Sequence, residues 1–318
     1  MSDRALHCEI GGYLELERFT GPMLHEEAAA LSSGRGGLSL LIRQKQIRKI
    51  ALPDYLCDVV RAACEGAEVS IYPIGADLKP GELHLDDETW LYLVNYFGQL
   101  SGEEIREWGE RHPRLIVDNA QAYFDLPVPG IDTIYTCRKF LGVADGGFLY
   151  TDAAIPELPE DESHGRMGFV LGRFERPAEE YYAEAAKNND TLPTEARRMS
   201  PITRNLLHAV DYDRVKIART ENFRILHGAL GEFNLLPLLR ETEGAYAYPL
   251  MLENGAEIRR KLIGQRIFVP RLWPNVLQEQ PADSTAYRLT EQILPLPCDQ
   301  RYGREEMDRI IQAVTGLL

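Results

Sequence analysis

The chain has 318 residues, of which 44% are hydrophobic, and it carries a formal net charge of −14. This length allows one large or two medium domains with a sizeable core. The negative charge argues against nucleic-acid and anionic-membrane partners. No apolar run approaches the roughly 18 residues that span a bilayer, and no leader pattern is recognised at the N-terminus. We therefore expect a cytoplasmic protein with no membrane partner.

The cysteines are scattered along the chain and form no C-x-x-C pair. This pattern is typical of free thiols in a reducing cytosol, and the ligand spacing of a zinc site is missing. We therefore expect no metal. The five positions are Cys8, Cys57, Cys64, Cys137 and Cys298.

The first predicted elements are a helix over residues 24–31 and a glycine-rich turn over 32–37 that leads into a second helix. Free N–H groups at a helix start bind anions, and glycines let a phosphate approach closely. A flexible loop with a serine N-cap is the alternative interpretation of this turn.

From residue 49 onwards, short apolar runs alternate with helical segments. This pattern predicts a mostly parallel sheet with helices on its faces. The expected strands are 49–52, 69–72, 90–94, 115–117, 133–135 and 148–150, and the expected helices are 57–65 and 103–111. Ligands bind beyond the carboxyl ends of the strands in such sheets. The side chains expected at those ends are Asp54, Tyr55, Asn95, Asp118, Gln121 and Lys139.

The second half of the chain begins with an irregular, polar stretch over residues 153–200. Helical periodicity returns over 202–230, with a break near Asp211. A smaller α+β unit follows, with strands expected at 246–252, 267–270 and 293–296 and helices at 256–262 and 304–314. We therefore expect a large domain over residues 1–232, including the connecting helix, and a small C-terminal domain over 233–318.

Lys139 is the centre of the most informative stretch, Y-T-C-R-K-F-L-G-V-A-D-G-G-F-L-Y. A lysine that is desolvated, or that lies beside a cation such as Arg138, titrates below its usual value and becomes a usable amine. A nearby acid such as Asp118 could serve as the partner of a pyridinium nitrogen. A solvated surface lysine is the alternative for one lysine taken alone.

The order of these motifs resembles the DegT/DnrJ/EryC1/StrS family of sugar aminotransferases, which are fold-type-I enzymes dependent on pyridoxal 5'-phosphate (PLP). The resemblance covers residues 32–314 and rests most on D-N-A-Q at 118–121, Lys139 and D-G-G at 145–147. It implies that Lys139 holds the cofactor aldehyde, that Asp118 pairs with the pyridine nitrogen and that Gln121 lies by the ring. Lys139 and Asp118 are thus the expected catalytic residues.

The resemblance also indicates the remaining site residues. The family's phosphate turn corresponds to Gly34-Arg35-Gly36, where Arg35 replaces a hydroxyl residue. The family often has a serine before the lysine, whereas the nearest hydroxyl here belongs to Thr136. The other expected cofactor-binding residues are Tyr55, as a stacking side chain, and Asn95; a plain core residue is the alternative for Tyr55. The expected substrate-binding residue of the small domain is Arg271, for which a surface salt bridge is the alternative. Asn188 and Asn189 are expected to reach a partner chain's site, and a merely solvated loop is the alternative for them.

The implied function is transfer of an amino group from a donor, expected to be glutamate, to a keto-sugar, expected to be nucleotide-linked, in polysaccharide or secondary-metabolite biosynthesis. The implied assembly is a homodimer. Two alternatives stay open. One is a non-catalytic or regulatory PLP-binding member of the fold. The other is a PLP-dependent sugar dehydratase, although that branch has histidine where this chain has Lys139.

Overall fold

The computed structural model describes residues 10–318, and its largest element is a seven-stranded sheet in the order β1–β7–β6–β5–β4–β2–β3. Neighbouring strands from β3 to β6 pair in parallel, whereas β7 is antiparallel to both β6 and β1. The predicted α/β fold with a mostly parallel sheet is confirmed. The strands are β1 (Ala29–Leu31), β2 (Lys49–Pro53), β3 (Glu68–Tyr72), β4 (Trp90–Val94), β5 (Leu115–Asp118), β6 (Asp132–Thr136) and β7 (Gly147–Tyr150).

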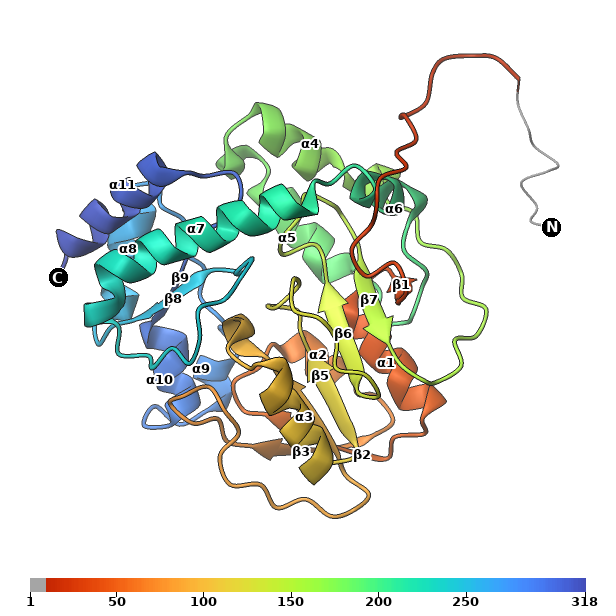
Figure 1. The fold of residues 1–318 in the computed structure, drawn as a ribbon, viewed down its shortest axis with the longest axis horizontal. Helices are drawn as coiled ribbons and strands as arrows, with labels where there is room; N and C mark the ends of the chain where they lie inside the picture. The colour runs from red at the N-terminus through yellow and green to blue at the C-terminus, as the bar shows by residue number, and fades with distance from the viewer. Residues whose placement is uncertain (1–9) are drawn as a thin grey trace.

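Helices cover the sheet on both faces, with α3 (Gly102–Arg111) in front of the strands and α1 (Gly34–Gln44) behind β6 and β7 (Figure 1). Every residue of β4, β5 and β6 is buried, as expected for parallel strands covered on both sides. The other helices are α2 (Asp58–Ala62), α4 (Gly168–Glu175), α5 (Tyr182–Thr191), α6 (Pro201–Leu207), α7 (Tyr212–Leu230), α8 (Gly255–Gly264), α9 (Val276–Glu279), α10 (Thr285–Gln292) and α11 (Arg304–Thr315).

A smaller unit is built around the antiparallel pair β8 (Tyr248–Met251) and β9 (Ile293–Leu296). Helix α7 runs from the large sheet to this unit (Figure 1). Its C-terminal half supplies Phe223, Leu226 and Leu230 to the same core as Leu250 and Ile310. The C-terminal half of α7 therefore belongs to the core of the small unit although it precedes residue 233. The predicted domain boundary between residues 232 and 233 stays a prediction.

The carboxyl ends of the strands meet at one edge of the sheet. Strand β5 ends at Asp118, β6 ends three residues before Lys139, and β1 leads directly into the start of α1. Because β7 is antiparallel, it begins at this same edge with Gly147. The topology thus brings chain segments from four different elements together at the edge where ligands bind in such sheets.

Two predicted elements near the ends of the chain are wrong. Residues 24–28 form a turn rather than a helix, and His25 there adopts a left-handed φ of 64°. The following residues pair with β7 as β1, so tertiary pairing overrides the short helical pattern. The strand expected over 267–270 is absent, because β8 and β9 pair only with each other in the part of the chain that the structure describes.

The expectation of an irregular segment over residues 153–200 is also wrong, because it contains α4 and α5. The run A-E-E-Y-Y-A-E-A-A-K at 178–187 is rich in alanine and glutamate, which favour helices. Helix α10 was not anticipated either, although Ser284 caps its start by accepting a hydrogen bond from the Tyr287 amide at 3.2 Å.

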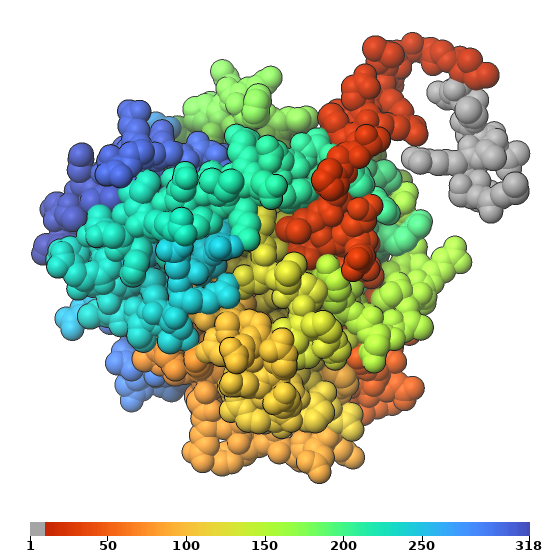
Figure 2. Space-filling model, viewed as in Figure 1, coloured from red at the N-terminus to blue at the C-terminus, as the bar shows by residue number. Residues whose placement is uncertain are grey.

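The space-filling view shows the same face as a continuous body from which the N-terminal segment, in red, extends outwards (Figure 2). Residues 10–20 of this segment are exposed. None of the helices within residues 10–318 has the length and apolar character needed to cross a membrane.

His25 is buried against β6 and β7, on the face of the sheet opposite α1, and packs on the Tyr135 ring with centroids 4.1 Å apart. Its Nε2 atom donates to the Tyr123 carbonyl at 2.8 Å, and its Nδ1 atom accepts from the Tyr150 hydroxyl at 3.1 Å. Burial lowers the pKa of His25 to about 4, and the hydrogen bond to the Tyr123 carbonyl offsets only part of this shift.

This histidine predicts an acid-dependent loss of stability. The unfolded chain binds the His25 proton below about pH 6.5, whereas the folded chain resists it down to about pH 4. The free energy of unfolding should therefore fall by up to about 3 kcal/mol across this window from His25 alone. Urea unfolding at several pH values should show a smaller fall for His25→Asn, since asparagine tolerates the left-handed backbone. An equal fall in the wild type and in His25→Asn would show that His25 does not cause the loss of stability.

Candidate functional site

A cavity of about 400 Å³ opens at the carboxyl edge of the sheet, between the strands, the start of α1, and the segment that precedes α9. Lys139, Asp118 and Gln121 line it together with Gly34 and Arg35. These residues come from distant parts of the sequence, and the structure brings them to one cavity. Within residues 10–318, no cluster of three or more potential metal ligands accompanies them.

Lys139 lies in the turn after β6, and its side chain is open to the cavity. The Lys139 side chain is exposed to solvent in the open cavity, and its Nζ atom lies 5.6 Å from the centroid of the Tyr246 ring. Partial loss of hydration among the surrounding protein atoms lowers the pKa of Lys139, and Arg138 lowers it further, while Asp118 and Cys57 oppose the shift. The sequence-based expectation of a lysine with a lowered pKa agrees with this environment.

Asp118 is the last residue of β5 and is buried at the base of the cavity. One carboxylate oxygen accepts from the Tyr92 hydroxyl and the other from the Ala120 amide, each at 2.8 Å. A carboxylate has about four acceptor positions, so these two bonds orient the group and leave it free to accept one more donor. Asp118 can therefore receive an N–H from a ligand in the cavity.

Arg35 and Arg138 form the basic end of the cavity. Arg35 donates to the main-chain carbonyl of Asn189 at 3.1 Å, and Arg138 donates to the side-chain oxygen of the same residue at 2.8 Å. Asn189, which was expected to act on a partner chain, thus lies at the cavity of its own chain. Asn188 lies outside the lining and donates to the Ala144 carbonyl at 2.8 Å, which ties α5 to the Lys139 turn.

The two glycines of D-G-G are required by close packing where β7 meets the start of α1. Gly146 has a left-handed φ of 123°. A Cβ atom on Gly147 would lie 2.6 Å from the carbonyl carbon of Ser33 and 2.7 Å from the amide of Gly34. The glycines therefore let the start of β7 lie directly against the start of α1.

Several predicted cofactor-binding residues serve the framework instead of the cavity. Asn95 is fully buried, accepts from the Leu100 amide at 2.8 Å and donates to Asn119 at 3.1 Å. Gly36 donates its amide to the Ser33 hydroxyl at 3.1 Å, and it is not part of the lining. Tyr55 is buried behind Trp273, at 4.8 Å between ring centroids, and does not line the cavity.

Thr136 and Arg271 also differ from their expected roles. Thr136 lines the cavity, but its hydroxyl donates to the Gly146 carbonyl at 3.1 Å, so this proton is not available to a ligand. Arg271 lies outside the lining and pairs with Glu291 at 3.1 Å. The substrate-binding prediction for Arg271 therefore has no support in this arrangement.

The structure adds lining residues that the sequence did not indicate. Trp273 and Tyr246 close the cavity from the side of the small unit, and Tyr92 reaches Asp118 from β4. Tyr92 and Tyr246 lie inside predicted strands, where an aromatic side chain is most often core. The sequence held no signal for their roles because they depend on how distant elements pack.

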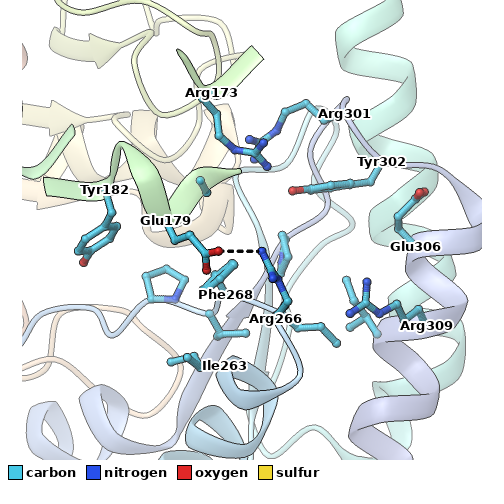
Figure 3. Close-up of a pocket in the computed structure, with 16 residues that line it drawn as sticks. Arg173, Glu179, Tyr182, Ile263, Arg266, Phe268, Arg301, Tyr302, Glu306 and Arg309 are labelled. Carbon is cyan, nitrogen blue, oxygen red and sulfur yellow. Dashed lines mark hydrogen bonds and ion pairs between the residues drawn. The ribbon is translucent and has the colours of Figure 1, made fainter. Parts of the chain in front are cut away.

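A second, larger hollow of about 640 Å³ lies between the α4–α5 segment and the small unit (Figure 3). Its lining contains no lysine, cysteine or serine. Arg266 pairs there with Glu179 at 3.3 Å, and Arg301 is engaged by Asp299 at 2.7 Å. The lining of this hollow offers no lysine amine and no buried acid, so the smaller cavity around Lys139 is the candidate active site.

No protein-family model and no curated protein sequence matches the chain. Solved structures do share its fold. DesV from S. venezuelae, solved with a ketimine intermediate, has a TM-score of 0.65 at 18% identity, covering 95% of this chain and 90% of DesV. A DegT DnrJ EryC1 StrS aminotransferase from Brucella abortus has a TM-score of 0.61 at 16% identity, covering 91% of this chain and 85% of that one.

The sugar aminotransferase CalS13 from Micromonospora echinospora is a third example, with a TM-score of 0.65 at 12% identity, covering 91% of this chain and 87% of CalS13. Other chains of this fold were solved in a PLP form or with bound PMP. At these identities the likeness is one of fold. The chain therefore has the fold shared by these aminotransferases over nearly its whole length.

Proposed function

We propose that the protein is a PLP-dependent aminotransferase of the DegT/DnrJ/EryC1/StrS type that transfers an amino group to a keto-sugar. One observation carries the proposal. The amine of Lys139, the carboxylate of Asp118 and the guanidinium groups of Arg35 and Arg138 line one cavity at the carboxyl edge of the sheet. An amine, an acid and a cationic end are the three groups that an aldehyde-bearing pyridine phosphate needs.

The residues present fit this cofactor. The Nε atom of Arg138 is buried and has no hydrogen-bond partner among the described residues, so the basic end has unused donor capacity. Lys139 would bond to the aldehyde, and Asp118 would accept the pyridine N–H. Gln121 is buried at the cavity wall, and its side-chain oxygen accepts from the Phe97 amide at 2.8 Å, which fixes its side chain there; it would lie by the ring.

The cofactor, when bound, supplies an electron sink for the carbanion formed at the amino donor. The chain supplies the proton chemistry. The carboxylate of Asp118 keeps a proton on the pyridine nitrogen, which maintains that sink. The lowered pKa of Lys139 favours its neutral amine, so Nζ could move a proton between the α-carbon of the donor and the cofactor.

The proposed substrates are glutamate as donor and a nucleotide-linked keto-sugar as acceptor, in polysaccharide or secondary-metabolite biosynthesis. The fold shared with a sugar aminotransferase such as CalS13 supports this class. A cytoplasmic location suits such soluble substrates. The dehydratase alternative is disfavoured by Lys139, and a non-catalytic PLP-binding protein would have no need for the proton-transferring amine.

Single-turnover kinetics test the activity. The cofactor-loaded protein, mixed with glutamate, should lose its visible absorption band and release 2-oxoglutarate. Asp118→Asn should still bind the cofactor but react roughly 10²–10³-fold more slowly, because an amide holds the pyridine proton less well than a carboxylate.

Asp87→Asn, at an exposed position, provides the control and should react at the wild-type rate. Wild-type speed in Asp118→Asn would show that the acid is misassigned. If the wild type released no oxo acid from glutamate or any other amino donor, the non-catalytic alternative would hold.

We also propose a homodimer with α4 and α5 at its interface. Leu171, Phe174 and Tyr182 on these helices are 64%, 94% and 75% exposed, and such an apolar patch is typical of an interaction surface. Light scattering should give twice the mass of the 36.0 kDa chain, and Phe174→Asp should shift the protein towards one chain. A wild-type mass of one chain at working concentration would end this proposal.

A further inference from the structure

Two arginines of one chain face the same end of the Lys139 cavity. Arg35 is the second residue of α1, and Arg138 immediately precedes Lys139. Both guanidinium groups donate to Asn189, one to its carbonyl and one to its side-chain oxygen. Two cations from separate elements thus converge on one neutral amide.

Neither guanidinium is neutralised by an acid in direct contact. Within residues 10–318, Arg35 and Arg138 take part in no ion pair; the acids that act on them at longer range are Asp58 and Asp190 for Arg35 and Asp145 for Arg138. Burial lowers the pKa of both arginines, that of Arg138 to about 10, and the charge of Arg35 contributes to the shift of Arg138. Two positive charges that repel each other and have lost part of their hydration favour the binding of an anion between them.

The start of α1 adds further donors at this end. Ser33 caps the 11-residue helix through the Gly36 amide, which leaves the amides of Gly34 and Arg35 without intrahelical partners. Gly34 and Arg35 both line the cavity, and a Cβ atom at position 34 would lie 3.1 Å from Ile134, so the glycine lets the helix start lie close against β6. Donors from the main chain and from two guanidinium groups therefore point to a ligand with several oxygens and more than one negative charge.

Helix α5 of the same chain holds this arrangement in place. Asn188 anchors the helix to the Ala144 carbonyl, and the Ser33 hydroxyl donates to the Pro193 carbonyl at 3.3 Å just after the helix. Asn189 therefore reaches the arginines from a fixed element. The phosphate end is walled by the chain's own α5 segment.

We propose that Arg35 and Arg138 form a two-guanidinium clamp for the phosphate monoester of the cofactor, positioned by Asn189 of the same chain. This inference rests on the proposed function. Arg138 directly precedes Lys139 in the sequence, and Lys139 would bind the aldehyde at the other end of the cofactor. The clamp takes the role that a hydroxyl residue at position 35 or 136 would otherwise have.

The clamp predicts how the protein distinguishes PLP from pyridoxal, which lacks the phosphate. Apoprotein is titrated with each aldehyde, and the visible band of the lysine-bound form gives the two Kd values. Arg35→Gln and Arg138→Gln should each weaken PLP binding about 10- to 100-fold, the range for a hydrogen bond to a charged group. Pyridoxal binding should change by less than about twofold in Arg35→Gln, because the clamp does not contact the ring. In Arg138→Gln the changed environment of Lys139 acts on both aldehydes, so the ratio of the two Kd values reports the clamp.

Arg43→Gln, at the opposite end of α1, is the matched control and should leave both Kd values unchanged. Circular dichroism and the unfolding midpoint confirm that each variant is folded, and Arg138→Lys should retain part of the preference for PLP. Equal losses for PLP and pyridoxal would overturn the clamp but leave the proposed function standing. Failure of the wild type to form a visible band with either aldehyde would overturn the proposed function and the clamp together.

Discussion

The Lys139 turn is held from two sides, and the geometry of the site depends on this restraint. On one side, the Phe140 carbonyl accepts from Arg219 at 3.0 Å and from Gln300 at 2.8 Å. On the other side, the fully buried Asp145 accepts from the amide and hydroxyl of Ser200 and from the Thr203 hydroxyl. Buried charges and carbonyls are costly without such partners, so these contacts fix the turn strongly.

This restraint also joins the parts of the molecule. Arg219 lies in α7 and donates in addition to the Ala245 carbonyl at 2.8 Å, before β8. The same guanidinium therefore links the connecting helix, the small unit and the residue next to the reactive amine. A displacement of the small unit would act directly on Lys139, while Trp273 and Tyr246 from that side would move with it. The amine is thus placed by long-range contacts as much as by its own strand.

The features that sequence reasoning predicted are those with a local cause. Buried apolar runs gave the strands, a serine and glycines marked the start of α1, and strand ends located Asp118 and Lys139. The remainder depends on which way a side chain points after a strand. Asn95 and Tyr55 follow strands as Asp118 does, yet their side chains turn into the framework. The periodicity of the sequence cannot tell whether a side chain at a strand end points into the cavity or into the framework. It also did not predict α5, and so it could not place Asn189 beside the cavity.

The most direct test is chemical labelling of the reactive amine. Protein loaded with PLP is reduced with borohydride, digested, and mapped by mass spectrometry. The structure predicts one modified position, Lys139, because it is the lysine in the cavity that Asp118, Arg35 and Arg138 line. Lys139→Ala should retain no label, while Lys187→Ala, on the exposed face of α5, should be labelled as the wild type is. A label on another lysine, or none on Lys139, would contradict the account.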